Sequence, residues 1–176
     1  MVNYKDARHI IVDIETLGTE PGCPILEIAA AVLYNKGVEK AFHARIDLDS
    51  NIAHGQTKLS KDTLVWWMNK REQLLSLLNN GRPFDVALKE FSQWLTDISW
   101  DSGLYFWAKS PQFDYGILED AFKKLDLRVF WNYRSIRDIR TIDNPLFITH
   151  DLKNNHNAVK DVENETIILR KVIWGE

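Results

Sequence analysis

The sequence predicts an α/β fold in which helices flank a mixed β-sheet, and three observations lead to this prediction. Three apolar segments near the N-terminus have the length of strands, and a short turn joins the second to the third. Helical patterns follow, and one further apolar segment lies between two of them. Strands joined by a hairpin run antiparallel, whereas a strand reached through helices runs parallel to the first. We therefore expect an antiparallel meander extended by a parallel strand.

Strands are predicted where short runs of β-branched, aromatic and other apolar residues lie between turn signals. The segments of this kind are residues 9–14, 25–34, 39–46 and 104–107. Gly18 and the Pro21–Gly22 pair interrupt the chain after the first strand. The Asn-Lys-Gly sequence at residues 35–37 forms the turn of a hairpin between the second and third strands.

Helices are predicted where apolar residues recur three and four positions apart. Five segments show this spacing, and they are residues 60–78, 84–95, 110–125, 134–141 and 157–174. Ser60 and Asn157 are suitable N-caps, because the side-chain oxygen of each can accept a hydrogen bond from a backbone N–H. Ser110 followed by Pro111 begins the third helix, since proline suits the first helical position.

Length, charge and cysteine content limit the classes of protein that fit. The 176 residues are enough for one domain with a substantial core, so we expect residues 1–176 to form a single domain. The net charge of -3 argues against a protein that holds nucleic acid through a generally basic surface. Cys23 has no second cysteine to pair with. Since no stretch is long enough to span a membrane and no secretory signal is evident, we expect a cytoplasmic protein.

Asp13 and Glu15 stand two residues apart at the end of the first predicted strand. Side chains alternate along a strand, so these two carboxylates point in the same direction. Like charges this close destabilise each other unless a cation neutralises them, and Mg²⁺ prefers carboxylate and water oxygens. The pair therefore indicates a metal site, although the same residues could also begin a solvated loop.

Asp114, His156 and Asp161 are further candidates for a catalytic site. Asp114 lies in the first turns of a predicted helix, where an acidic residue also interacts favourably with the helix dipole. His156 and Asp161 are five residues apart, about 140° on a helix, so they would not share a face if both were helical. With Asn157 as N-cap, His156 lies in the preceding loop and can turn toward Asp161. A surface histidine and a helix-start aspartate are the alternative.

Taken in order, these motifs resemble those of the DEDDh exonucleases, which include ribonuclease T and the proofreading subunit of bacterial DNA polymerase III. A small phage and bacterial subgroup is more similar still, and the resemblance runs from residue 9 to about residue 170. It rests on Asp-Ile-Glu-Thr-Leu-Gly at residues 13–18, Trp-Trp at 66–67, Trp-x-Lys-x-Pro-x-Phe-Asp at 107–114, Arg-Asp-x-Arg-Thr at 137–141 and His-Asn-Ala at 156–158. Many DEDDh enzymes have asparagine where this chain has Lys109 or Ser110, so substrate contacts are expected to differ there.

The resemblance implies a ribonuclease H-like fold with a mixed five-stranded sheet, and a metal-dependent 3'-5' exonuclease activity. It also implies two divalent cations, Mg²⁺ or Mn²⁺, with Asp13 bridging them, Glu15 and Asp161 completing one site and Asp114 acting through water. His156 would be the general base. The surrounding carboxylates would favour the charged form of His156, so bound cations are expected to be needed to keep it neutral.

Six residues are candidates for substrate contacts. In the family the residues after the first motif contact the terminal nucleotide, which makes Thr16 and Leu17 candidates, although Leu17 could equally be core. Of the tryptophan pair, Trp67 falls in register with the apolar helix face, so Trp66 is the candidate for stacking on a base. Phosphate contacts or simple surface charge would explain the remaining three residues, Lys109, Arg137 and Arg140.

The expected partner is a single-stranded or frayed 3' end, and the sequence does not choose between DNA and RNA. Two alternatives remain open, a catalytically silent nucleic-acid-binding module and a ribonuclease H-like endonuclease. Homodimers are frequent among the relatives, and exposed aromatic residues would permit one here.

Overall fold

The computed structural model describes residues 4–35, 37–98, 103–142 and 156–175. Five strands form one sheet in the order β3-β2-β1-β4-β5. Their bounds are β1 Arg8–Thr16, β2 Ile25–Tyr34, β3 Gly37–Arg45, β4 Leu104–Ala108 and β5 Ile136–Asp138. The helices are α1 Leu48–Ala53, α2 Lys61–Met68, α3 Arg71–Leu78, α4 Phe84–Thr96, α5 Pro111–Lys124 and α7 Ala158–Trp174.

The sheet has the mixed topology that the sequence predicts. β1 pairs antiparallel with β2, and β2 pairs antiparallel with β3. β4 runs parallel to β1, and β5 runs parallel to β4. The long apolar strands β1 and β2 lie in the middle of the sheet, because their side chains are buried on both faces.

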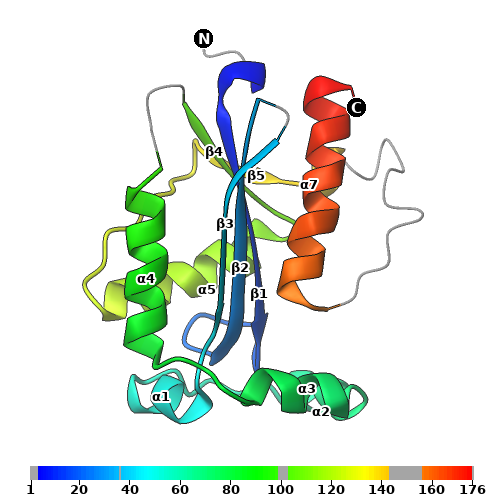
Figure 1. The fold of residues 1–176 in the computed structure, drawn as a ribbon. Coiled ribbons are helices and arrows are strands. Elements are labelled where there is room, and N and C mark those ends of the chain that lie inside the picture. Colours follow the sequence, from blue (N-terminus) through cyan, green and yellow to red (C-terminus); the bar gives the residue numbers. More distant parts are fainter. Residues whose placement is uncertain (1–3, 36, 99–102, 143–155, 176) are drawn as a thin grey trace.

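Helices cover both faces of the sheet (Figure 1). α4 and α5 pack on one face, against the inward side chains of Ile10, Val12 and Ile14. α7 packs on the other face, against Ile11 and its neighbours on β2 and β4. α2 and α3 lie across one end of β1 and β2 with a small core of their own, formed by Leu17, Leu26, Trp67 and Leu77. Because residues alternate along β1, the odd-numbered side chains, including Asp13 and Glu15, belong to the α7 face.

The prediction of a helix over residues 134–141 is wrong. Residues 136–138 form β5 instead, and Ile136 pairs with Phe106 of β4. The backbone N–H of Ile139 then donates to the carbonyl oxygen of Ala108, and residues 140–142 are helical. Pairing with a strand that is distant in the sequence outweighs the local helical spacing here.

The single helix predicted over residues 60–78 is divided in the structure into α2 and α3. Ser60 is the N-cap, as expected, and its hydroxyl accepts a hydrogen bond from the N–H of Thr63. Asn69 ends α2, and Lys70 has φ and ψ of -126° and 40°, which are not helical. The short helix α1 was not predicted, because its six residues are too few to show a helical period.

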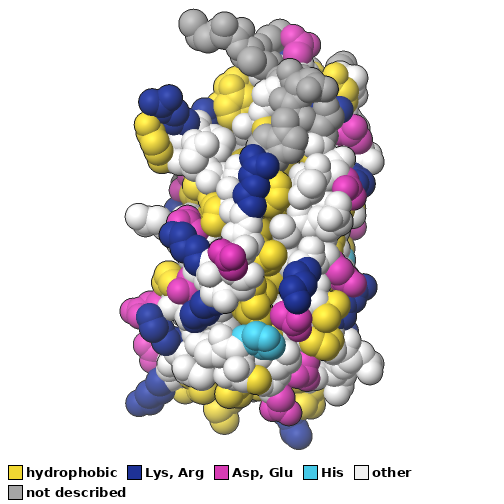
Figure 2. Space-filling view, turned by 90° about the vertical axis from the view of Figure 1, so that its left-hand side faces the viewer, with side chains coloured by type: hydrophobic (Ala, Val, Ile, Leu, Met, Phe, Trp, Pro, Cys, Tyr) yellow, Lys and Arg dark blue, Asp and Glu magenta, His cyan; other side chains and the backbone are white. Residues whose placement is uncertain are grey.

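The surface agrees with the modest net charge. Figure 2 shows the side of the molecule that carries α4, where Lys and Arg side chains are interspersed with Asp and Glu and neither sign forms a continuous patch. In the part of the chain that the structure describes, no helix combines the length and the apolar character needed to cross a membrane.

Candidate active site

The end of β1 carries two acidic side chains on the α7 face of the sheet. Asp13 pairs with Ala29 and Glu15 pairs with Glu27 on the neighbouring strand β2. Glu15 is buried and Asp13 is half-buried. A charged pair at the end of an otherwise apolar central strand therefore faces the start of α7.

α7 brings a third carboxylate to this pair. Asp161 lies in the first turn of the helix, and its Oδ2 accepts a hydrogen bond from the N–H of Asn157, 3.2 Å away. Asp13, Glu15 and Asp161 each offer a carboxylate oxygen, and these oxygens all lie within 4.8 Å of one another. Three oxygen ligands at this spacing suit a hard divalent cation such as Mg²⁺ or Mn²⁺.

Asp114 lies on α5, which packs on the other face of the sheet, and it is not one of these three grouped carboxylates. The carbonyl oxygen of Ser110 accepts the N–H groups of Phe113 and Asp114 and so begins the helix, with Pro111 in its first turn. Burial raises the pKa of Asp114 to about 7, although backbone hydrogen bonds, first that of Ile14, act in the opposite direction. Asp114 is therefore a buried acid beside β1.

The acids oppose one another's ionisation. Burial raises the pKa of Asp13 well above its ordinary value, and the charges of Asp114, Glu165, Glu15 and Asp161 raise it further. Burial, followed by the charge of Asp161, raises the pKa of Glu15 to about 8. Ionised carboxylates in this position need a positive partner, and the donor set is one that divalent cations prefer.

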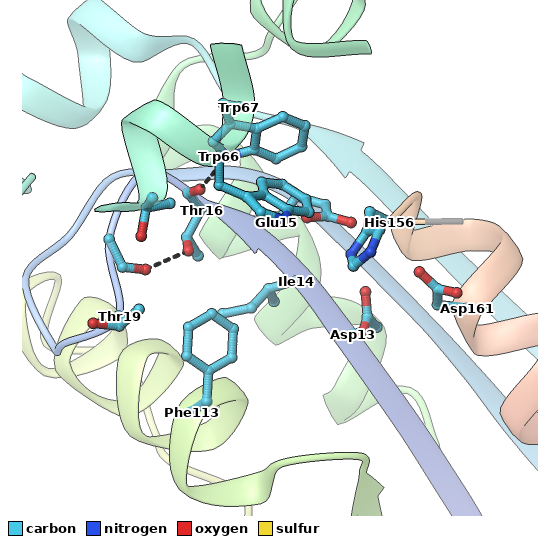
Figure 3. Close-up of a pocket in the computed structure, with 12 residues that line it drawn as sticks. Asp13, Ile14, Glu15, Thr16, Thr19, Trp66, Trp67, Phe113, His156 and Asp161 are labelled. Atoms are coloured by element: carbon cyan, nitrogen blue, oxygen red, sulfur yellow. Dashed lines mark hydrogen bonds between the residues drawn. The ribbon is translucent and has the colours of Figure 1, made fainter. Parts of the chain in front are cut away.

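His156 lies where the sequence predicts it, just outside α7. Asn157 is the N-cap, and its side-chain oxygen accepts a hydrogen bond from the N–H of Lys160. His156 has a φ of 48°, in the left-handed region, which turns the chain sharply before the helix. In Figure 3 the His156 ring lies among the labelled side chains of Asp13, Glu15 and Asp161.

The expectation that the acids would favour the charged form of His156 is wrong for this structure. Burial lowers the pKa of His156, and the nearby positive charge of Lys70 lowers it further, against the opposing effect of Asp161. The neutral ring, which can accept a proton, is therefore favoured even when no cation is bound.

Helices α2 and α3 form the opposite side of the site. The ring of Trp66 meets the His156 ring edge-on, with centroids 4.6 Å apart, and the Lys70 ammonium lies 4.5 Å from the Trp66 ring. The Gln73 side chain donates a hydrogen bond to the backbone carbonyl of His156. Trp67 is only 1% exposed, as its helical register predicts, and its Nε1 donates to the carbonyl of Thr16 at 2.9 Å.

A pocket of about 220 Å³ lies between the end of β1 and helices α2, α5 and α7. The lining residues that were predicted from the sequence to belong to the site are Asp13, Glu15, Thr16, Trp66, His156 and Asp161. Figure 3 shows Phe113 on the side of the pocket opposite Trp66 and Trp67. The structure thus brings residues from β1, α2, α5 and α7 into one hollow that contains acids, a histidine and aromatic rings.

Thr16 and Leu17 differ in their access to the pocket. Thr16 lines it, although its hydroxyl donates to the carbonyl of Gly18 at 2.6 Å. Leu17 is 4% exposed and packs in the small core beneath α2 and α3. Of the two roles considered for Leu17, the structure favours core packing, because a side chain enclosed in this way has no exposed surface that a base could contact.

The three basic candidates also differ. Lys109 is half-buried and lies close enough to the site to lower the pKa of His156. Arg140 is exposed, forms an ion pair with Asp138 at 2.6 Å and lowers the pKa of Asp114.

The phosphate contact expected of Arg137 is not supported. Its guanidinium donates to the Tyr4 hydroxyl at 2.7 Å and lies 4.8 Å from the Tyr105 ring. Tyr105 pairs with His9 at the start of β1, whereas the acids lie toward the end of that strand. Arg137 pairs with Trp107, which pairs with Ile11, so it lies on the α7 face of the sheet, and its guanidinium extends from there toward Tyr4 and Tyr105.

Four residues of the site were missed at the level of sequence. Glu27 interrupts the apolar run of β2, and a lone charge in such a run is a signal that could have revealed it. Glu165 follows Asp161 by four residues and so shares its helix face, which is a second usable signal. Lys70 and Gln73 have no local signal, because their positions depend on the break between α2 and α3.

Comparisons with solved structures agree with the fold. The nuclease domain of 3'hExo, a DEDDh family member solved with rAMP, matches with a TM-score of 0.67 at 14% identity, over 98% of this chain and 94% of that one. Exonuclease I of E. coli, solved with a 5cy-dA13 oligonucleotide, matches with a TM-score of 0.66 at 11% identity over 97% of this chain. The chain spans only 41% of the length of exonuclease I. A comparison with curated protein sequences finds no match.

A family model assigns the chain more directly. The model described as the 3'-5' exoribonuclease Rv2179c-like domain matches residues 8–174, which include every acid of the site and His156. The five-stranded mixed sheet and the flanking helices are those of the ribonuclease H-like fold expected from the motifs. The chain therefore belongs to the Rv2179c-like 3'-5' exoribonuclease domain family.

Proposed function

We propose that the chain hydrolyses nucleic acid from its 3' end by a two-metal mechanism, with Asp13, Glu15, Asp114 and Asp161 as the metal-binding acids and His156 as general base. The observation that carries this proposal is the group of three carboxylate oxygens within 4.8 Å of one another, beside His156 in a single pocket. Three carboxylates that no cation neutralised would repel phosphate, so they would be a liability to a protein that only bound nucleic acid. This argues against a catalytically silent binding module.

Each of the four acids would have a different role in cation binding. Asp13, whose pKa is raised by the charge of each of the other three, would bridge two ions, while Glu15 and Asp161 would complete one site. Asp114 is fully enclosed and would act largely through water. Two divalent cations, when bound, stabilise the attacking and leaving oxygens of a displacement at phosphorus.

His156 would take a proton from the attacking water. Its lowered pKa keeps the ring neutral near physiological pH, and the Gln73 and Trp66 contacts hold it above the acids. A positioned base of this kind contributes about 10²–10⁴-fold to a rate. The 3' terminal nucleotide would enter the pocket beside Thr16 and Trp66, with Lys109 and Arg140 near its phosphates.

We propose single-stranded or frayed 3' ends as substrates, with RNA tested first because the family description names an exoribonuclease. Exonuclease I of E. coli, a structural neighbour, was solved with DNA oligonucleotides, so DNA needs the same test. We further propose that residues 1–176 act as one domain in the cytoplasm with Mg²⁺ or Mn²⁺. A homodimer is also proposed.

The test uses RNA and DNA oligomers of identical sequence, labelled at the 5' end and incubated with Mg²⁺, Mn²⁺ or excess chelator. We expect a ladder of products shortened one nucleotide at a time, with release of mononucleotides only when a cation is present. Asp13→Ala should abolish release on both substrates. Full activity in chelator would refute the two-metal mechanism, and internal fragments would indicate an endonuclease instead.

A further inference from the structure

Glu165 is a fifth carboxylate, beyond the four acids that the motifs predict, and it lies outside both the pocket lining and the group of three carboxylate oxygens. It is 2% exposed and lies on α7, one helical turn after Asp161. Residues four apart on a helix share a face, so Glu165 points from α7 toward the sheet as Asp161 does. Neither of its carboxylate oxygens has a hydrogen-bond partner among the residues that the structure describes.

Glu165 lies on the buried face of α7, which packs against β1, the strand of Asp13, and electrostatic interactions link it to Asp13 and Asp114. Of the charges that raise the pKa of Asp13, that of Glu165 ranks second, after Asp114 and ahead of Glu15 and Asp161. The pKa of Glu165 is itself raised well above its ordinary value, first by burial and then by Asp114. Lys109 is the positive group that opposes this change in the pKa of Glu165.

Glu27 shows how the same fold treats a buried glutamate that has a structural role. Glu27 is completely buried, and its Oε1 accepts a hydrogen bond from His43 Nε2 at 2.8 Å. Its Oε2 accepts the N–H of Ala158, the first residue of α7, at 3.1 Å. Arg45 adds a positive charge 3.5 Å from Oε1. Glu165 has none of these hydrogen bonds, so its burial has no comparable structural compensation.

We propose that Glu165 is a further cation-binding residue, which acts with Asp13 and Asp114, directly or through water, on the second divalent cation of the site. The inference rests on the proposed two-metal function and extends it from four acids to five. A buried carboxylate with two unpartnered oxygens, on the same helix face as Asp161, is a suitable oxygen donor for Mg²⁺ or Mn²⁺. A proton shared between Glu165 and a neighbouring acid, without a role in cation binding, is the competing explanation.

The test measures cation binding rather than catalysis. Wild-type protein and Glu165→Gln are titrated with Mn²⁺ by calorimetry in the presence of adenosine monophosphate, which stands for a reaction product. We expect two Mn²⁺ ions on the wild type and a second binding event weakened at least tenfold in Glu165→Gln. The first event should remain within about twofold, because Glu15 and Asp161 are intact. Glu163→Gln, an exposed residue on the same helix, is the matched control and should bind as the wild type does.

The outcomes separate this inference from the proposed function. Glu165→Gln that binds both ions with wild-type affinity would overturn the role of Glu165 and favour the shared proton, since glutamine can still donate a hydrogen bond. A wild type that binds no Mn²⁺ would overturn the two-metal function itself.

Thermal unfolding in chelator provides a second readout. Replacement of a buried carboxyl group that has no hydrogen-bond partner among the described residues should leave the melting temperature of Glu165→Gln equal to or above that of the wild type, with a smaller rise on addition of Mn²⁺. Glu165→Met, similar in length and without charge, should show the same pattern. A lower melting temperature in chelator for both variants, with an unchanged Mn²⁺-dependent rise, would indicate a purely structural residue.

Discussion

The two sides of the pocket are stabilised in opposite ways. The acid side, formed by Asp13, Glu15, Asp114 and Asp161, is a set of buried and half-buried carboxylates in which neighbouring charges raise the pKa of Asp13 and of Glu15. The helical side, formed by Trp66, Lys70 and Gln73, consists of a ring contact, a cation over a ring and a hydrogen bond, all directed toward His156. The carboxylates of the acid side therefore need a cation to compensate their charges. The contacts of the helical side are all made within the protein.

This difference assigns separate tasks to the two sides. Changes on the acid side should alter metal affinity and the dependence of stability on pH. Changes on the helical side should alter the chemical step through His156 and leave the cations in place. A variant on either side can therefore be measured for both metal binding and rate. An acid-side variant should lose both together, whereas a helical-side variant should lose rate alone.

Among the variants that separate the two sides, the largest effect is expected at His156, where the two sides meet. His156→Ala should lower kcat about 10²–10⁴-fold, because the attacking water loses its base. Binding of Mn²⁺ should change little, since the carboxylates remain. His54→Ala is the control and should keep an activity near that of the wild type, because His54 is the C-cap of α1, where its Nδ1 contacts the carbonyl of Ser50. Equal losses of rate and Mn²⁺ affinity in His156→Ala would mean that the two sides are not separable.

A second effect concerns the stability of the acid side in chelator. Glu15 and Asp114 have pKa values raised to about 8 and about 7, so the folded state retains protons that the unfolded state has lost. Their contribution to stability is full below pH of about 4 and is lost as pH rises through 7 to 8. The lowered pKa values of His9 and His156 act in the opposite direction.

Melting temperatures of the wild type and Glu15→Gln between pH 5 and 8 isolate the contribution of Glu15, because the histidines are common to both proteins. We expect the wild type to lose stability with rising pH by more than the variant does. A tenfold difference in proton affinity between the folded and unfolded states is worth about 1.4 kcal/mol, which corresponds to roughly 3–6 °C in a chain of this length. Saturating Mn²⁺ should remove most of the difference. If the melting temperatures of the two proteins in chelator depended on pH in the same way, burial and neighbouring charges would not raise the pKa of Glu15.

The two sides also differ in how far the sequence predicts them. Asp13 and Glu15 are predictable because the alternation of a strand is local, and His156 because Asn157 is a recognisable N-cap. The helical side is not predictable in the same way. A continuous helix over residues 60–78 would have placed Gln73 elsewhere, and only the break at Asn69 and Lys70 directs it to His156.

Long-range pairing explains the remaining errors in the fold and the site. The helical spacing of residues 134–141 is real, yet hydrogen bonds to β4 make residues 136–138 a strand. Arg137 of the same strand contacts Tyr4, a residue that the local sequence around Arg137 does not reveal, and its role as a phosphate contact stays a prediction. Partners brought together by the sheet cannot be inferred from the spacing of one segment.

The smallest effect is expected at Trp66, where two roles can be separated kinetically. Stacking on a base predicts that Trp66→Ala raises KM, whereas support of the His156 ring predicts a fall in kcat with little change in KM. The 4.6 Å ring contact favours the second result, and we expect a loss of about tenfold in kcat. Tyr133→Ala removes an aromatic side chain that is 81% exposed and should leave both constants unchanged. Trp66→Phe should recover much of the rate, because a smaller ring can still meet His156 edge-on. A rise in KM alone would show that Trp66 contacts the substrate. Gln73 would then be the main residue that positions His156.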